Sequence, residues 1–422
     1  MHGIVNKILK VGSVKLISIP VILLTSVLLA RWLGPELFGK YSFVMALLPL
    51  LSLPISGGMP QLLVRQISFY LHHKLAGKLK GMVYFSFIWS IVFSLVVICI
   101  TYFFASFIID DVERLNLVKA AIWFIPFLAF IAIATGILQG LNEPVFANVI
   151  QQLLLPLLIL FIIVGLYYFN HLTPYNIFIS QTLVGIFCAC LILKVLTKKF
   201  PAEANAEKAS YQQKVWFASL LPFSLLALAN TFNTQIGIII LGFYSSDEAV
   251  AGLRIAERGV LFVGIPLGII NSVAAPYIVN LYELNDISKL QVFAKNIARV
   301  SVAISFPIVL FFFFFGEDLI EFVFGLEYVA LSYWPLVILS LGQLFNVFCG
   351  SVGHLLSMTG HATVTLKGQL TALFFSVLIC AVFVPFYGAI GAAIGVTAGV
   401  VTWNLLLLYS VKKILKINAC AI

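Results

Sequence analysis

The sequence predicts an all-α, polytopic membrane protein with about 12 transmembrane helices. Hydrophobic residues make up 62% of the 422-residue chain and charged residues only 10%, whereas about 25% of residues in a typical soluble domain are charged. A hydrocarbon core ~30 Å thick needs roughly 20 helical residues per crossing, and about a dozen apolar runs reach that length. Backbone polar groups cannot stay unpaired in lipid and strand-like alternation is absent, so we expect helices.

The predicted spans form two groups of six. Each span is an apolar run of helical length, and each loop is a polar interruption between two runs. In the first half we expect spans at about residues 11–30, 39–57, 81–106, 118–138, 146–168 and 175–196. In the second half we expect them at about residues 216–241, 250–275, 299–316, 334–357, 366–386 and 388–411.

A long polar stretch, about residues 197–214, separates the two groups and is named here the linker segment. Its charged composition is typical of a connection between domains. We therefore predict an N-terminal six-helix bundle over residues 1–200 and a C-terminal one over residues 201–422. Weak internal similarity supports a duplication, because a shift of 212 residues places Glu36 on Glu248. An even number of spans per half makes these repeats parallel and the bundles pseudo-symmetric.

The distribution of Lys and Arg predicts the orientation, because basic loops stay on the cytoplasmic side. With the N-terminus inside, inner loops hold most of the 25 basic residues, and outer loops hold only Arg31, Lys40, Arg114 and Lys119. The sequence thus favours both termini inside. The first apolar run carries Lys15 and Pro20 and has no convincing small-residue cleavage site, so we interpret it as an uncleaved span rather than a signal peptide.

Several kinds of function are disfavoured by composition and motifs. The net charge of +9 follows the topology and favours contact with anionic membrane lipid, not with nucleic acid. The run GPELFGK at 34–40 is close to a phosphate loop, but Tyr41 stands where a Ser or Thr is needed and no strand precedes it. The six cysteines lie in spans or the inner tail, which indicates no disulfide framework. We predict no cofactor and no metal site.

Polar residues inside the spans are the candidate functional positions, because an ionisable group in hydrocarbon costs at least ~2.5 kcal/mol. They gather on three helical faces, which we expect to line a hydrated cavity. These are Lys15, Ser18 and Ser26 in the first span, Asn230, Asn233 and Thr234 in the seventh, and Gln343, Asn346, Gly350, His354 and Ser357 in the tenth. By contrast, Gly388, Gly391 and Gly395 form a small-residue face suited to helix packing.

The eighth predicted span begins with Arg254, Glu257 and Arg258, a cluster with net positive charge. One interpretation is an anion site, because the planar guanidinium offers two hydrogen bonds and keeps its charge when buried. The other is a pair within the helix between Glu257 and one arginine, with the side chains reaching toward the outer surface. Even in the second case, one arginine remains available for an anion.

Several runs together resemble the polysaccharide flippases of bacterial O-antigen and capsule export. They are ARWLGPELFGKYSF at 30–43, GMPQLLVRQIS at 58–68, ILQGLNEP at 137–144, LLPFSLLALANTF at 220–232, FYSSDEAVAGLRIAER at 243–258, FVFGLEYVAL at 322–331 and VPFYGAIGAAIG at 384–395. That family belongs to the multidrug/oligosaccharidyl-lipid/polysaccharide exporter superfamily. The resemblance implies two six-helix bundles around a central cleft, in the bacterial cytoplasmic (inner) membrane, moving undecaprenyl-diphosphate-linked oligosaccharide from the inner to the outer leaflet.

The resemblance and the polar faces together give each candidate residue a hypothetical role. Lys15, Arg254 and Arg258 would hold the diphosphate, and Arg65 would attract the head group at the inner mouth. The polar candidates Asn230, Asn233, Gln343, Asn346 and His354 would meet sugar hydroxyls or water. Glu257 is the candidate for proton or cation coupling. We expect alternating access by rocking about the linker segment, with membrane lipid and other glycan assembly proteins as candidate partners.

Three other functions remain open, of which a pure scaffold or channel does not explain the family resemblance. A multidrug or organic-cation antiporter of the same superfamily would share the fold, but it favours an acidic cavity, and the embedded charges here sum to positive. A membrane glycan polymerase or ligase would be an enzyme with a large outer loop, and the outer segments here, about 107–117 and 317–333, are short. We therefore expect a transporter rather than an enzyme.

Overall fold

The computed structural model describes residues 2–421 except residue 285, without the side chains of residues 2–11, 15, 16, 272, 273, 275 and 276. In this described part the regular elements are all helices, and none is a strand. The prediction of an all-α chain is confirmed. The chain divides into two compact units: one holds the residues up to 33 together with 44–228, and the other holds residues 34–43 together with 229–422. The division of the chain into bundles at residues 200 and 201 stays a prediction.

The first unit contains thirteen of the helical elements and the beginning of the next. They are α1 (His2–Leu51), α2 (Leu53–Ser56), α3 (Met59–His72), α4 (Ala76–Phe104), η1 (Ala105–Phe107), α5 (Val112–Ala121), η2 (Ile122–Phe124), α6 (Ile125–Gly140), α7 (Pro144–Asn148), the π-helix η3 (Val149–Leu154), α8 (Leu155–Tyr168), α9 (Pro174–Lys199), α10 (Ala202–Ala206) and the start of α11 (Gln213–Tyr244). The broken helix α1 passes through both units, because its residues 34–43 belong to the second.

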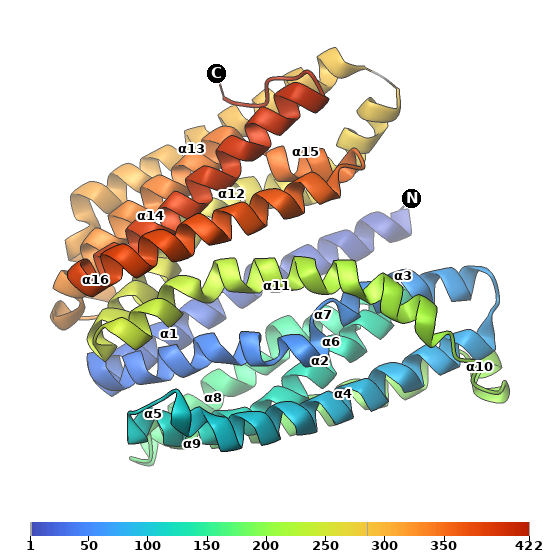
Figure 1. Cartoon of the computed structure of the whole chain (residues 1–422), viewed down its shortest axis with the longest axis horizontal. Helices are drawn as coiled ribbons and strands as arrows, with labels where there is room; N and C mark the ends of the chain where they lie inside the picture. Colours follow the sequence, from blue (N-terminus) through green and yellow to red (C-terminus); the bar gives the residue numbers. More distant parts are fainter. Residues whose placement is uncertain (1, 285, 422) are drawn as a thin grey trace. The chain divides into compact units, whose positions relative to one another are not determined.

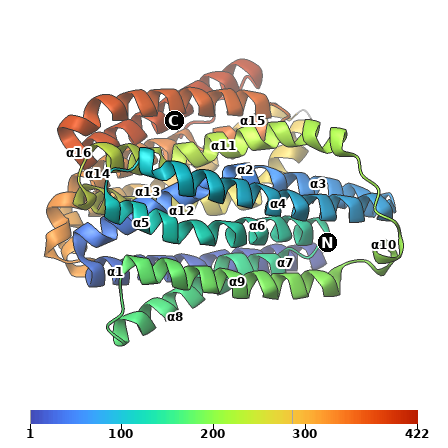
Figure 2. The same ribbon diagram turned by 60° about the horizontal axis from the view of Figure 1, so that its bottom comes forward.

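The core of the first unit forms around α6, which packs against α3, α4 and α9 (Figure 2). Small residues allow these helices to approach closely. A methyl group on Gly136 would meet the backbone of Pro60 at 2.7 Å, and one on Gly140 would meet Ile67 at 2.8 Å. Such contacts are typical of membrane helix pairs, where packing rather than the hydrophobic effect holds helices together.

The linker segment, residues 197–214, is anchored within the first unit. Lys80 on α4 donates from Nζ to the carbonyl oxygens of Asn205 at 2.7 Å and Glu207 at 3.0 Å. The backbone N–H of Ser210 donates to the Gly77 carbonyl at 2.9 Å. These bonds fix the segment to α4. Its polar composition therefore indicates that it meets water, not that it is a loose connection between domains.

The second unit begins with the remainder of α11 and continues through α12 (Asp247–Glu283), α13 (Ile287–Val323), η4 (Leu326–Tyr328), α14 (Val329–Cys349), α15 (Val352–Met358) and α16 (Ala362–Ile414). Its central helix is α14, which packs against α12, α13 and α16. The chain leaves α14 at Gly350, whose φ of 71° is in the left-handed region that favours glycine.

Helix α16 is a hairpin that reverses at Gly388, where φ is 51° and ψ is −125°. Figure 1 shows its two halves side by side in orange and red. A methyl group on Gly391 would overlap the carbonyl of Phe383, and one on Gly395 would overlap the sulfur of Cys380. The predicted small-residue face is therefore confirmed at Gly391 and Gly395, while Gly388 makes the turn.

Each of the 12 predicted spans overlaps helical structure. Nine helical stretches in the described part of the chain are long and apolar enough to cross a membrane. Two of these are broken by non-helical glycines, Gly34 in α1 and Gly388 in α16, so each contains two predicted spans. Helix α12, which covers the eighth span, is 37 residues long. The orientation with both termini inside stays a prediction.

Candidate functional site

The start of α12 and residues 34–43 build a charged cluster within the second unit. The Ser246 hydroxyl caps α12 by accepting from the Ala249 N–H at 3.3 Å, and Asp247 and Glu248 occupy the first turn, where negative charge is favourable. A methyl group on Gly39 would overlap the Asp247 carbonyl. Glycine at this position therefore lets residues 34–43 lie directly against α12.

Hydrogen bonds hold the Glu248 carboxylate in its charged form. The pKa of this carboxyl is lowered because its own backbone N–H and the Ser246 hydroxyl donate to it, with a smaller contribution from the positive charge of Lys40. Hydrogen bonds to a charged carboxylate stabilise that form. The first turn of α12 therefore carries a fixed negative charge.

Arg254 joins α12 to residues 34–43 and has both ends of its guanidinium occupied. Its Nη1 donates to Glu257 Oε2 at 3.1 Å, and its Nη2 donates to the Ser42 carbonyl at 3.1 Å. The Arg254 side chain is 12% exposed and that of Glu257 is 25% exposed. The predicted pair within the helix is thus present, and it uses Arg254.

Arg258, one turn further along α12, is a cation that takes no part in this ion pair. Its Nε atom is buried and has no hydrogen-bond partner among the described residues. A buried guanidinium donor without a partner costs free energy comparable to a lost charge-assisted hydrogen bond. An anion that accepted from Arg258 would remove that cost, so this is the cluster's most suitable anion-binding position.

Lys40 is a charged residue that the sequence placed in an outer loop but that the structure buries. It is only 7% exposed, and its Nζ contacts Glu36 Oε1 at 2.7 Å. The spacing of four residues between Glu36 and Lys40 is the signal that could have found this pair. Its burial could not be read from the spacing, because burial depends on contacts between distant residues that form only on folding.

The other predicted diphosphate ligands do not join this cluster. Arg65 is exposed on α3 in the first unit. Lys15 lies on α1, and its side chain is outside the described residues. Their roles stay predictions.

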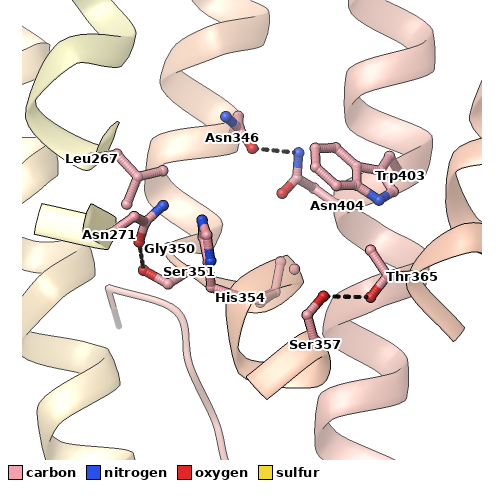
Figure 3. Close-up of a pocket in the computed structure, with 12 residues that line it drawn as sticks. Leu267, Asn271, Asn346, Gly350, Ser351, His354, Ser357, Thr365, Trp403 and Asn404 are labelled. Atoms are coloured by element: carbon pink, nitrogen blue, oxygen red, sulfur yellow. Dashed lines mark hydrogen bonds between the residues drawn. The ribbon is translucent and has the colours of Figure 1, made fainter. Parts of the chain in front are cut away.

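A partly open cavity of about 260 Å³, lined largely by polar residues and named here the polar cavity, belongs to the second unit (Figure 3). It contains four members of the stripe predicted for the tenth span: Asn346, Gly350, His354 and Ser357. The prediction that they share one continuous helix is wrong, since α14 ends at Cys349 and α15 begins at Val352. The break leaves all four in the cavity lining nonetheless. The cavity is completed by Leu267, Asn271, Ser351, Val352, Gly353, Thr365, Trp403 and Asn404.

The remaining polar candidates lie elsewhere in the second unit. Gln343 is not in the cavity lining and sits beside Gly264 of α12. Asn233 donates from Nδ2 to the carbonyls of Ala229 at 2.8 Å and Gln369 at 3.2 Å, which ties α11 to α16. Asn230 is exposed on α11. No group of three or more His, Cys, Asp or Glu side chains in the described part of the chain is placed to hold a metal.

Residues 4–282, about two thirds of the chain, match the sequence model of the family described as polysaccharide biosynthesis protein. The chain belongs to this polysaccharide biosynthesis family. A relative from Staphylococcus aureus, the capsular polysaccharide biosynthesis protein CapF, is 24% identical over 244 residues, which cover 57% of this chain and 60% of that protein. The predicted recognition of a polysaccharide-export family is confirmed.

Solved structures give the fold of this family member. A multidrug resistance MATE family transporter of the MOP superfamily has a TM-score of 0.82 at 14% identity, with 94% of each chain covered. The lipid II flippase MurJ has a TM-score of 0.76 at 18% identity, covering 95% of this chain and 87% of that one. The chain therefore has a MATE- and MurJ-like fold and is a multi-pass membrane protein, of the inner membrane in bacteria.

Proposed function

We propose that this family member is a flippase that moves undecaprenyl-diphosphate-linked oligosaccharide repeat units, of O-antigen or a related surface polysaccharide, across the cytoplasmic membrane by alternating access. Membership of the polysaccharide biosynthesis family and the fold likeness to a lipid II flippase support the class of cargo. The diphosphate and sugars face a steep barrier in lipid, whereas the polyprenyl tail does not. A protein need supply only a polar, cationic passage for the head group.

The observation that carries the proposal is the unpartnered, buried Nε of Arg258 beside the Arg254–Glu257 pair. Charged groups in a membrane span are retained where a partner or a function compensates their cost. Glu257 compensates Arg254, which leaves Arg258 with a free donor. A diphosphate supplies the matching acceptor oxygens, and the guanidinium fork suits phosphate.

A multidrug or organic-cation antiporter is the second candidate, favoured by the fold likeness to the MATE transporter. Such a cargo is a cation and would require a net negative site. Glu257 is the carboxylate that could serve it or couple transport to an ion, but it is already paired with Arg254 at 3.1 Å. The charges of Arg254, Glu257 and Arg258 sum to positive, which favours the anionic cargo.

The proposal is tested by deletion and complementation in the source organism. A strain lacking the gene should lose surface glycan and accumulate lipid-linked repeat units in the inner leaflet, and the wild-type gene should restore export. Retained surface glycan together with lost drug resistance would establish the antiporter instead. Loss of glycan with single repeat units already present in the outer leaflet would indicate the third candidate, a polymerase or ligase.

A further inference from the structure

We propose that the polar cavity of the second unit is a binding site for one uncharged sugar ring, a pyranose of the transported glycan. The inference rests on the proposed function for the source of that sugar, but binding of a free sugar is tested separately. The cavity is partly open and is lined by α12, α14, α15 and both halves of the α16 hairpin, all in the same unit. It does not include Arg254, Glu257 or Arg258.

The size of the cavity matches a single small ring. Its volume of about 260 Å³ far exceeds the ~10–15 Å³ that one water molecule requires. It lies just below the range of roughly 300–1,000 Å³ found for sites that hold drug-sized ligands. An oligosaccharide would not fit, whereas one ring of it would.

The chemistry of the lining selects against ions. No Lys, Arg, Asp or Glu is among the 12 residues that surround the cavity. A phosphate or a sugar acid would meet no cation to neutralise it, and a divalent cation would meet no carboxylate, its usual ligand. What remains are carboxamides, hydroxyls, one imidazole and one indole, which are neutral groups suited to a neutral ligand.

Unused hydrogen-bonding groups of both kinds belong to residues of the cavity lining. Asn404 is 1% exposed, and its Oδ1 is buried without a partner in the described structure. Its Nδ2 is fully used, because it donates to Asn346 Oδ1 and to the Val400 carbonyl, both at 2.9 Å. The Trp403 indole Nε1 is likewise buried with no described partner. The lining residues therefore hold at least one acceptor and one donor that no described group uses.

This mixture fits sugar hydroxyls, because each hydroxyl both donates and accepts. An anion would need only donors, and a metal ion only acceptors. Other lining groups are already held in position: the Ser351 hydroxyl donates to Asn271 Oδ1, and Ser357 lies 3.5 Å from the Thr365 hydroxyl. Figure 3 shows these pairs around the imidazole of His354, which belongs to the same lining.

The indole of Trp403 supplies an apolar wall for the C–H face of a sugar. Glycines leave the space it occupies: its ring atoms Cζ2 and Cδ1 lie 3.4 and 3.2 Å from methyl groups built on Gly353 and Gly368. Leu267 contributes a second apolar surface. A site with apolar walls and a few placed polar groups is the usual design of small-ligand pockets. The buried indole N–H additionally calls for a partner.

The test measures binding of uncharged methyl pyranosides to the purified full chain in nanodiscs by saturation-transfer NMR. We expect millimolar affinity for at least one of the methyl glycosides of glucose, galactose or N-acetylglucosamine. Trp403→Phe removes the indole donor and part of the apolar wall, and Thr365→Val removes a lining hydroxyl; each should weaken binding about five- to tenfold. Matched controls are Trp334→Phe, an exposed position, and Thr371→Val, whose hydroxyl bonds the Lys367 carbonyl within its own helix. Both controls should bind normally.

Several outcomes would overturn the inference. One is the absence of binding at 50 mM sugar by a folded wild-type protein, and another is equal weakening in lining variants and controls. Preferential binding of Na⁺ or of a uronic acid at the same lining residues would assign the cavity to an ion instead. The result is separable from the proposed function: pyranoside binding with no glycan export would retain the site and reject the flippase. Normal glycan export by the wild type, with binding and transport unchanged in Trp403→Phe, would retain the flippase and reject the sugar site.

Discussion

The same substitution should lower the stability of the protein at Arg254 and lower its transport activity at Arg258. Both are on α12 and four residues apart, but only Arg254 has described hydrogen bonds, to Glu257 and to the Ser42 carbonyl. The buried Nε of Arg258 has no such partner. Methionine keeps most of the length of the arginine stem while removing the charge and the donors, so Arg254→Met and Arg258→Met form a matched pair.

The expected magnitudes follow from these contacts. Arg254→Met removes two hydrogen bonds, of which the one to Glu257 joins charged groups and is worth ~1.5–3 kcal/mol. It also leaves the Glu257 carboxylate, 25% exposed, without its ion-pair partner. We expect the free energy of unfolding to fall by about 3 kcal/mol, the lower end for breaking a buried pair. Arg258→Met breaks no described bond of Nε and should change stability by less than about 1 kcal/mol, or increase it.

Two measurements separate the residues. The apparent unfolding temperature of each purified variant reports stability, and proteoliposomes loaded with a fluorescent lipid-diphosphate oligosaccharide report translocation. Arg258→Met should keep the wild-type unfolding temperature and lose translocation at least tenfold. Arg254→Met should unfold at a lower temperature. If Arg258→Met is as destabilising as Arg254→Met, or translocates at the wild-type rate, the division of roles is wrong.

Three further predictions concern the supporting structure. Gly395→Ala should destabilise the α16 hairpin by about 1–3 kcal/mol through overpacking, whereas Gly165→Ala, with nothing within 4 Å, should be neutral or stabilising in thermal unfolding. Lys80→Met should speed proteolysis of the linker segment, and Lys78→Met should not, because only Lys80 donates to its carbonyls. The pKa of Asp286 is lowered to about 2, chiefly by hydrogen bonds from Lys289. Because the folded-state pKa is depressed, its small stabilisation is present above pH ~4 and is lost as the pH falls toward 2; wild type and Asp286→Asn should converge in unfolding temperature there.

Local patterns in the sequence predicted the features that depend on nearby residues. The apolar runs predicted the spans, since helix length in a bilayer is set by its thickness. The spacing of three residues between Arg254 and Glu257 predicted their pair, and the helical stripe of Asn346, Gly350 and His354 predicted one wall of the cavity. The rest of the lining, with Asn271 and Asn404, could not be predicted. Its residues are contributed by other helices, and no pattern in a single sequence encodes which helices pack together.

Two segments pack in a unit that their place in the sequence does not indicate, and they show the same limit. Residues 34–43 precede the linker segment but pack in the second unit, and residues 201–228 follow the predicted boundary but pack in the first. Each is held by specific contacts. Gly39 lies against Asp247, and the buried Trp216 indole donates to the Tyr70 hydroxyl at 2.8 Å. A polarity pattern detects where a chain meets water, but membership of a unit is decided by such contacts between distant residues. Arg254 donates to the Ser42 carbonyl and so helps to fix residues 34–43 in the second unit. For this reason we assign Arg254 a structural role and propose that Arg258 binds the anion.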